Sequence, residues 1–236
     1  MFRSIILVVF TLFTLTMLSQ SVEAHDFWIE KKDGKYLILS GHDNLTEGYE
    51  PERVRDWIII NVKGQKIKTS ISKTEKGAYF NENGKDIALV NVFFDNKYWV
   101  KTTEGWKNIG KREAQKNGFQ ILESGRSYKF AKYINKWNDI FTKPLKTKIE
   151  IIPLNNPLKG ENLTVKILLE DKPLKDAPIF LNGAHEESLR TDSDGKANIS
   201  TRKGLNIISV TTKVPSASDP DGDQIYLRAS ISFNRE

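Results

Sequence analysis

Turn-forming dipeptides recur along almost the whole chain, and they constrain its fold more than any other feature. They are Asp33-Gly34, Lys63-Gly64, Asn83-Gly84, Asp95-Asn96, Glu104-Gly105, Asn182-Gly183, Asp194-Gly195 and Lys203-Gly204. Between them lie short runs rich in β-branched and aromatic residues, at 36–39, 57–62, 87–94 and 98–102. Short β-prone runs separated by such turns are typical of hairpins, so the sequence predicts a mostly β protein.

One stretch departs from this pattern. From Lys107 to Asn138 the chain has few β-branched residues and many Lys, Glu, Gln and Ala. Within it, Tyr128, Ala131, Lys132 and Asn135 fall at helical spacing. We therefore expect a short helical segment here, near residues 123–136.

The remainder, residues 148–236, predicts about seven short strands at regular spacing. These segments are 148–152, 163–169, 177–181, 187–190, 197–200, 206–212 and 225–233. Such spacing is typical of an immunoglobulin-like β-sandwich. The predicted organisation is an N-terminal β-rich domain at 25–146 with the helical segment, followed by an immunoglobulin-like sandwich domain at 147–236, with the boundary near Lys146.

Residues 1–24 have the pattern of a signal peptide. A basic start at Arg3 is followed by an apolar run from Ile5 to Leu18 and by small residues ending at Ala24. The run is shorter than the roughly 18 apolar residues that span a bilayer, and threonines interrupt it. Cleavage after Ala24 would make His25 the first residue of an exported protein. Because the chain has no cysteine, we expect a disulfide-free protein of the bacterial periplasm.

Charge and composition argue against a nucleic-acid partner and against a transmembrane segment. The formal net charge is +6, but the lysines are scattered through turns and strand ends rather than gathered in one stripe. With no recognition motif present, we expect no nucleic-acid partner. We also expect no transmembrane segment in the mature chain, because no later run is long and apolar enough.

The first hairpin predicts a pair of facing histidines. If Asp33-Gly34 is a two-residue hairpin loop, residues whose numbers sum to 67 face each other, and His25 faces His42. Directly opposed Cβ atoms lie roughly 4.5–5.5 Å apart, which lets two imidazoles bind one metal ion. The alternative is that one histidine merely ends a strand and the other lies in a loop. A one-residue bulge would also place the two rings on opposite faces.

Signal cleavage would add a third nitrogen ligand. The ordinary pKa of an α-amine is about 7.7–8.0, and that of an imidazole is about 6.5. A metal ion can therefore displace the protons of both groups of His25 near neutral pH. Nitrogen-rich sites suit Ni(II), Co(II), Cu(II) or Zn(II). Glu47, Asp43 and Asp26 are nearby carboxylates that could complete or orient the site. Alternation along the strand turns Asp26 away from the His25 face, so we favour Glu47.

Acidic residues at alternate positions form a second candidate site. Asp219, Asp221 and Asp223 resemble part of a calcium loop, but the glycine and distal glutamate of an EF-hand are missing from their positions. An acidic turn is the simpler interpretation, although Asp219 and Asp221 could supply oxygen ligands if the loop folds towards the N-terminal part. We find no nucleophile elbow, phosphate loop or paired carboxylates, and we expect no enzymatic activity.

Several segments, in order along the mature chain, resemble a known family. They are "AHDFWIE" (24–30), "SGH" (40–42), "YEPERV" (49–54), "FFDNKYWVKTTEGWKN" (93–108), "YKFAKYINKW" (128–137), "IEIIPLNNPLKGENLTVKILLEDKPLKDAPI" (149–179), "TDSDGKANI" (191–199) and "KVPSASDPDGD" (213–223). Together they are similar to the DUF4198 family, also labelled the NikM-like nickel uptake family. The resemblance implies a periplasmic protein linked to nickel or cobalt uptake by energy-coupling-factor-type transporters, with a membrane permease as partner. It places the family's mature histidine at His25 and its Gly-His at Gly41-His42.

Three functions follow from these patterns. The first is a metal-binding module that captures Ni(II) or Co(II) and passes it to a permease. The second is a copper enzyme, because an amine with two imidazoles is also the copper arrangement of lytic polysaccharide monooxygenases. The third is a non-catalytic envelope scaffold or adhesion module whose histidines have no metal role, since a sandwich fold does not by itself determine function. We expect the first function, the metal-binding module, and keep the third, the scaffold or adhesion module, as the alternative.

Overall fold

Three β-sheets form the protein in residues 26–42 and 45–236, which are the residues that the computed structural model describes. The N-terminal sheet contains β1 (Asp26–Lys32), β2 (Lys35–His42), β3 (Leu45–Glu47), β5 (Ser72–Thr74) and β6 (Gly77–Asn81). The central sheet contains β4 (Val54–Asn61), β7 (Ile87–Thr102), β8 (Gly105–Lys107), β9 (Ile121–Ile134), β13 (Pro178–Leu181), β14 (Leu189–Arg190), β16 (Gly204–Pro215) and β17 (Gln224–Arg235). The C-terminal sheet contains β10 (Ile149–Pro153), β11 (Asn162–Leu169), β12 (Lys172–Pro173) and β15 (Lys196–Ser200).

Helical structure is limited in these residues to α1 (Lys111–Lys116) and two 3-10 turns, η1 (Pro51–Arg53) and η2 (Asp139–Thr142). The prediction of a mostly β, sandwich-like fold with a short helical segment is therefore confirmed. None of the described helices has the length and apolar composition needed to cross a bilayer.

The first hairpin has the predicted register. Its pairs run from Asp26 opposite Gly41 to Lys32 opposite Lys35, and the numbers of each pair sum to 67. Asp33 and Gly34 both have positive φ, 49° and 70°, as a tight two-residue turn between twisted strands requires. The Asp-Gly signal thus set both the turn and the register.

The helix predicted near 123–136 is wrong, because these residues form β9. β9 lies inside the central sheet, paired antiparallel to β7 and parallel to β17. Its side chains alternate between two hydrophobic cores, with Tyr133 in one and Ile134 in the other. Two neighbouring strands and two buried faces outweigh the helical spacing that we read from the sequence. The single α-helix of the described residues lies earlier, at Lys111–Lys116.

Each strand predicted in 148–236 overlaps an observed strand, and β12 is an addition. These strands divide between the C-terminal sheet and one end of the central sheet, which pack around a shared core that includes Ile151, Val165 and Phe233. The predicted boundary near Lys146 falls between η2 and β10. The parallel pairing of β17 with β9 continues the central sheet across it, so strands from both sides of residue 146 share one sheet.

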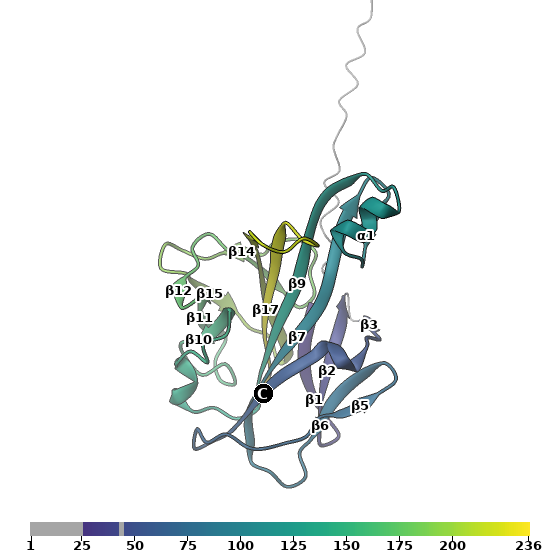
Figure 1. Cartoon of the computed structure of the whole chain (residues 1–236). Coiled ribbons are helices and arrows are strands. Elements are labelled where there is room, and N and C mark those ends of the chain that lie inside the picture. The colour runs from purple at the N-terminus through teal and green to yellow at the C-terminus, as the bar shows by residue number, and fades with distance from the viewer. Residues whose placement is uncertain (1–25, 43–44) are drawn as a thin grey trace, which may run out of the picture.

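The central sheet separates two cores. Adjacent residues such as Leu89 and Val90 point to opposite faces, and belong to different cores. One core lies under the C-terminal sheet and the other under the N-terminal sheet. Figure 1 shows β7 and β9 running through the molecule and projecting beyond the other strands at the end that carries α1.

A buried ion pair connects the central and C-terminal sheets. Lys132 Nζ lies 2.7 Å from Glu150 Oε1, and the two side chains are 3% and 2% exposed. Lys132 also donates to Ile151 O at 2.9 Å, and Glu150 accepts the backbone N–H of Leu145 at 2.9 Å. Burial lowers the pKa of Lys132, and the neighbouring Glu150 opposes that shift. The pair therefore fixes β9 against β10 across the predicted boundary.

We expect Lys132→Met to lower the free energy of unfolding by about 3–5 kcal/mol, because it leaves Glu150 buried without its cation. The double substitution Lys132→Met/Glu150→Gln should lower the free energy of unfolding by less, because both side chains are then neutral and the residue at 150 still accepts the hydrogen bond from Leu145. Urea denaturation of the three proteins measures the difference. A double variant as unstable as the single one would contradict this account.

Candidate functional site

The free edge of β1 is bonded by side chains of the last strand. Ser232 Oγ donates to Ile29 O at 2.6 Å and accepts from Ile29 N at 3.4 Å. Ser230 Oγ donates to Phe27 O. All four residues are buried, where an unpaired backbone group would be costly. Alternate serines of β17 thus replace the neighbouring strand that β1 lacks on this side.

Asp26, at the start of β1, is held at the same interface. Its Oδ1 accepts from Ser209 Oγ at 2.9 Å and forms an ion pair with Arg228 Nη1. Asp26 is 4% exposed, so its charge is compensated by these partners and not by water. The preference for Glu47 over Asp26 as a ligand stays a prediction. His25, the preceding residue and the principal predicted ligand, lies outside the described residues.

The other predicted ligands of this hairpin lie where β2 turns into β3. His42 ends β2, and its backbone partner is Leu45. Glu47, in β3, is opposite Ser40 and is exposed. A Cβ at Gly41 would lie 1.9 Å from the carbonyl oxygen of Leu45, so only glycine permits this close return of the chain. Asp43 lies outside the described residues. Gly41 therefore has a structural reason of its own, beside the metal role predicted for His42.

A buried lysine lies on the face of β9 that meets β1. Lys129 is 3% exposed and its Nζ lies 6.0 Å from the centre of the Phe94 ring. Burial and the nearby Arg228 lower the pKa of Lys129 to about 7, with Asp26 opposing the shift, Arg53 adding to it and Glu47 also opposing it. Lys129 thus lies close to the positive charge of Arg228, which Asp26 balances in part.

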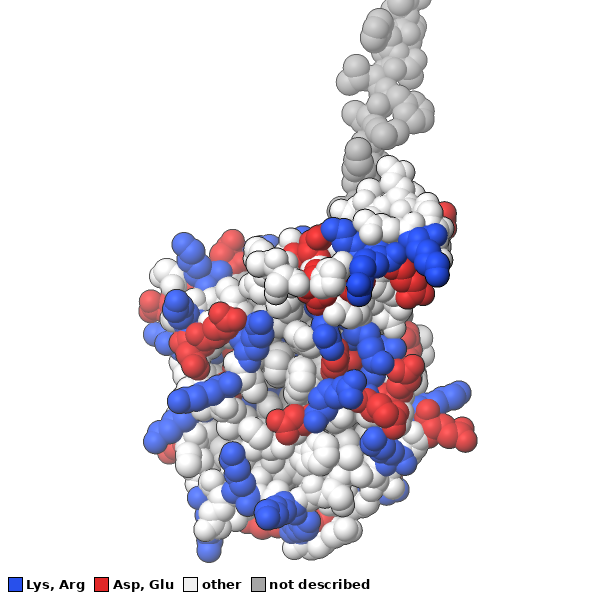
Figure 2. Space-filling model, viewed as in Figure 1, with Lys and Arg blue, Asp and Glu red and all other residues white. Residues whose placement is uncertain are grey.

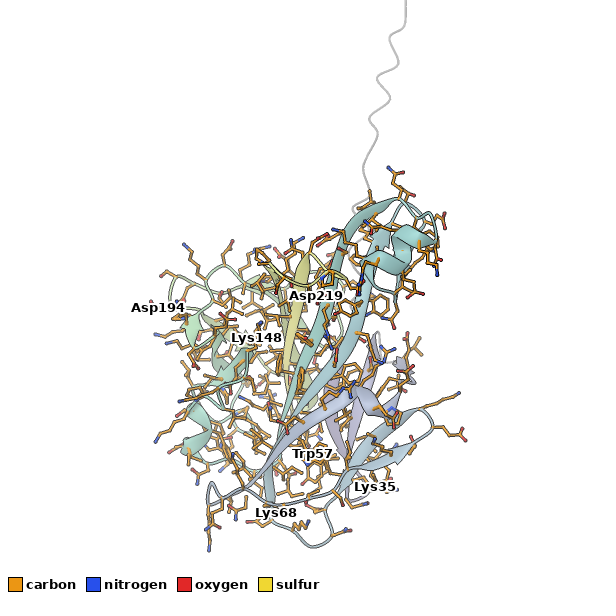
Figure 3. The ribbon with its side chains drawn as sticks, viewed as in Figure 1. Lys35, Trp57, Lys68, Lys148, Asp194 and Asp219 are labelled. Carbon is orange, nitrogen blue, oxygen red and sulfur yellow. The ribbon has the colours of Figure 1, made fainter. Side chains whose placement is uncertain are left out.

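The acidic loop at 219–223 binds other parts of the protein. Tyr98 Oη donates to Asp219 at 2.9 Å, and Asp219 lies near the projecting end of β7 and β9 (Figure 3). Asp221 pairs with Arg112 at 2.6 Å and Asp223 with Lys111 at 2.7 Å. These carboxylates hold α1. Across residues 26–42 and 45–236, no group of three or more histidine and acidic side chains is arranged to hold a metal ion. The proposed ligand role of Asp219 and Asp221 stays a prediction.

We call residues 97–123 the finger. It consists of the end of β7, β8, α1 and the start of β9. A bulge marks its base, because Asp95 pairs with Tyr128 while Tyr98 pairs with Arg126. Lys97, in this bulge, has a φ of 64°, and its backbone N–H donates to Asp95 Oδ1 at 3.1 Å. The buried Asp95 side chain thus stabilises a backbone conformation that lysine rarely adopts.

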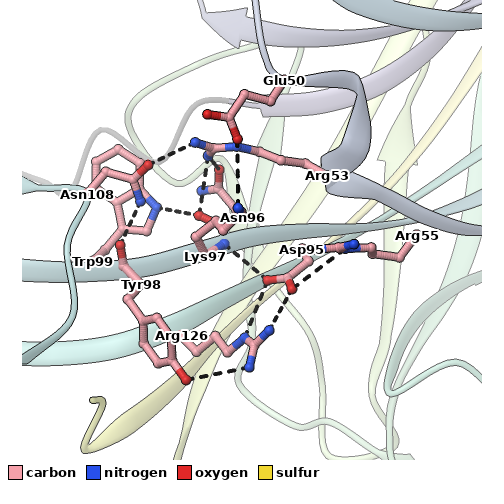
Figure 4. Close-up of polar contacts among 10 residues, drawn as sticks. All are labelled: Glu50, Arg53, Arg55, Asp95, Asn96, Lys97, Tyr98, Trp99, Asn108 and Arg126. Carbon is pink, nitrogen blue, oxygen red and sulfur yellow. Dashed lines mark hydrogen bonds and ion pairs between the residues drawn. The ribbon is translucent and has the colours of Figure 1, made fainter. Parts of the chain in front are cut away.

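Asp95 also binds arginine at the base of the finger (Figure 4). Arg126 Nη2 lies 2.6 Å from Asp95 Oδ2, and Arg55 Nε lies 4.0 Å from it. The Arg126 guanidinium lies 5.2 Å from the Tyr98 ring and 5.3 Å from the Tyr128 ring. Burial alone would raise the pKa of Asp95, but the hydrogen bonds from Arg126 and Lys97 and the charges of Arg126 and Arg55 outweigh it and lower the pKa.

Arg53 connects the finger to η1. Its Nη1 donates to Asn96 Oδ1 at 3.1 Å and its Nη2 to Asn108 Oδ1 at 2.9 Å, while Nε lies 3.3 Å from Glu50 (Figure 4). The segments 49–54 and 93–108, two of those that carry the family resemblance, therefore meet here, and Tyr98 connects them to a third, 213–223, through Asp219. The sequence patterns did not predict this network. Charged and amide residues beside the turns of those segments were the available signal, but their partners are distant in sequence.

Comparison with known proteins identifies a family but no function. A family model described as "Domain of unknown function (DUF4198)" matches residues 22–214. No curated protein matches significantly. No solved structure matches significantly either.

We predict that Arg228→Met lowers the free energy of unfolding by about 3–5 kcal/mol, because Asp26 is then a buried carboxylate without its cation. Arg202→Met, at an exposed position, should change it by less than about 0.5 kcal/mol. Urea denaturation of both variants provides the test. Equal effects of the two substitutions would show that the Asp26–Arg228 pair does not hold β1.

Lowering the pH should remove the contribution of Asp95 to the stability of the folded protein. Its pKa is lowered in the folded protein, so the stabilisation is present above the ordinary value of 3.8 and is lost as the pH falls through the folded pKa. We therefore expect Asp95→Asn to be less stable than the wild type near neutral pH, and the gap to narrow below about pH 4. Denaturant unfolding across this range measures it. A gap that stays constant would contradict the sign of the shift.

Proposed function

The chain belongs to the DUF4198 family, and from that premise we propose that it is an exported, periplasmic protein that binds Ni(II) or Co(II) for uptake. It would pass the ion to a membrane permease of an energy-coupling-factor-type system. The ligands would be the α-amine and imidazole of His25 and the imidazole of His42, with Glu47 as an oxygen ligand. Cu(II) and Zn(II) share this preference for nitrogen and are competing cargoes.

The observation that carries this proposal is the register of the first hairpin. Seven consecutive pairs follow the predicted rule, and the last of them is Asp26 opposite Gly41. The next pair under the same rule is His25 and His42. Opposed residues of an antiparallel pair are close enough for both side chains to reach one ion. The buried contacts of Asp26 support the proposal because they fix the strand beside the first ligand.

Electrostatics limits how such a site would work. Arg228 places positive charge behind this end of the sheet, which opposes a dication, while its partner Asp26 and the nearby Glu47 offset that charge. Binding would also have to displace protons from the amine and the imidazoles, so affinity should fall as the pH is lowered. Both effects favour reversible capture. Release to a permease would then be ligand exchange, with no reaction on the metal and no enzymatic activity.

A second candidate function is a non-catalytic envelope scaffold or adhesion module. It is favoured by the acidic loop, whose Asp221 and Asp223 are already paired with Arg112 and Lys111. Carboxylates used in this way stabilise an architecture and do not bind cargo. In this alternative the network at the base of the finger has the same purpose, and the histidines have no role in binding.

The test is calorimetric titration of Ni(II), Co(II), Cu(II) and Zn(II) into protein whose first residue is verified as His25. We expect one ion to bind, and expect either an added N-terminal glycine or His42→Ala to weaken binding at least about tenfold. His185→Ala is the matched control and should bind like the parent. If the extended and authentic proteins bind equally weakly, the metal proposal fails and the scaffold takes its place.

A further inference from the structure

The finger is the part of the protein that reaches furthest from the body. It projects past the ends of the neighbouring strands (Figure 1), and in the space-filling view much of its visible tip is formed by uncharged side chains, while basic side chains gather beside it over α1 (Figure 2). Exposed apolar side chains next to basic ones are the distribution found in protein segments that bind membrane interfaces.

Exposed apolar side chains support this description of the tip. Leu122, the second residue of β9, is 57% exposed. It sits at the irregularity where Thr102 pairs with Ile121 and Lys101 pairs with Glu123, so no residue of β7 faces it. Ile121, Phe119 and Trp106 are each partly exposed nearby. The irregular pairing thus presents a leucine to solvent at the end of a rigid hairpin.

The charges of the finger are predominantly positive. Residues 97–123 contain six lysine or arginine residues and three glutamates. Lys107 Nζ lies 4.5 Å from the centre of the Phe119 ring, and Lys101 Nζ lies 5.9 Å from that of Trp106. Within the described chain, Lys101 and Lys116 form no ion pair with a carboxylate. They are therefore available to an external anion without first breaking an ion pair.

The finger is also braced against the body. Lys111 and Arg112 bind the acidic loop, and Arg53 and Arg126 bind its base. Gly110 and Gly222 allow the loop to lie close, because a Cβ at Gly110 would be 2.9 Å from Asp221 Oδ1 and one at Gly222 would be 2.9 Å from the Cα of Gly125. A surface bound by the tip would therefore fix the orientation of the whole molecule.

We propose that the finger docks on the surface of an anionic phospholipid bilayer. Leu122 and the adjacent aromatic edges enter the headgroup region, and Lys101 and Lys116 contact lipid phosphates. One exposed leucine with partly buried neighbours offers too little apolar area to anchor the protein alone. Binding must therefore depend on charge, be reversible and weaken as salt screens the phosphates.

The experiment is co-sedimentation of the chain from residue 25 onwards, without added metal, with vesicles of phosphatidylcholine alone or with an equal part of phosphatidylglycerol. We expect binding only to the anionic vesicles, and loss of that binding at high salt. Lys101→Gln/Lys116→Gln should weaken it roughly tenfold or more, and Leu122→Ser should weaken it measurably without changing the net charge. The result does not depend on the metal proposal, because no metal is present.

Two control variants separate docking by the finger from general charge attraction. Lys159→Gln/Lys203→Gln removes the same charge near the opposite end of the central sheet, where Gly204 pairs with Arg235. Leu154→Ser changes another exposed leucine, 36% exposed, beside the C-terminal sheet. Both should bind like the parent. Absence of vesicle binding at low salt, or equal losses in the control and finger variants, would overturn the proposal, provided that all variants keep the parent's melting temperature.

Discussion

The arrangement of the sheets depends on one constraint: the backbone N–H and C=O groups on the free edge of β1 need hydrogen-bond partners. A strand at a sheet edge carries N–H and C=O groups that need partners once they are buried. Here the partners are Ser230 and Ser232, which alternate on one face of β17. Small hydroxyl side chains let the two backbones approach while supplying the missing hydrogen bonds. The N-terminal sheet is therefore attached by its edge to the face of the central sheet.

Buried ion pairs also fix how the sheets pack on one another. Asp26 meets Arg228 between the N-terminal and central sheets, and Lys132 meets Glu150 between the central and C-terminal sheets. Pairs of this kind add little net stability relative to apolar residues, but breaking one of them is costly. A shifted packing of either sheet would leave both members buried and unpaired. We infer that these pairs select one packing among those that the apolar residues alone would permit.

The same last strand joins the two candidate functional regions. β17 holds Asp26 beside the predicted metal ligands, and the loop that precedes β17 holds the finger through Asp221 and Asp223. Capture of a metal at one end and contact with a membrane at another would then be properties of one rigid body. A protein that delivers an ion to a permease needs such an orientation, and a scaffold would use the same rigidity without cargo.

Local sequence determined most elements of this protein. Asp33-Gly34 set the first turn and its register, and β-prone runs between turns placed most strands, because turn geometry and side-chain alternation depend on neighbouring residues. The same reasoning found the candidate ligands His25, His42 and Glu47. Only the tertiary structure decided that 121–134 is a strand, that β9 and β17 pair in parallel, and that Ser230, Arg228 and the arginines of the finger have partners. These depend on contacts between residues that are distant in sequence, up to 203 positions apart for Phe27 and Ser230, and pattern within a short window carries no information about them.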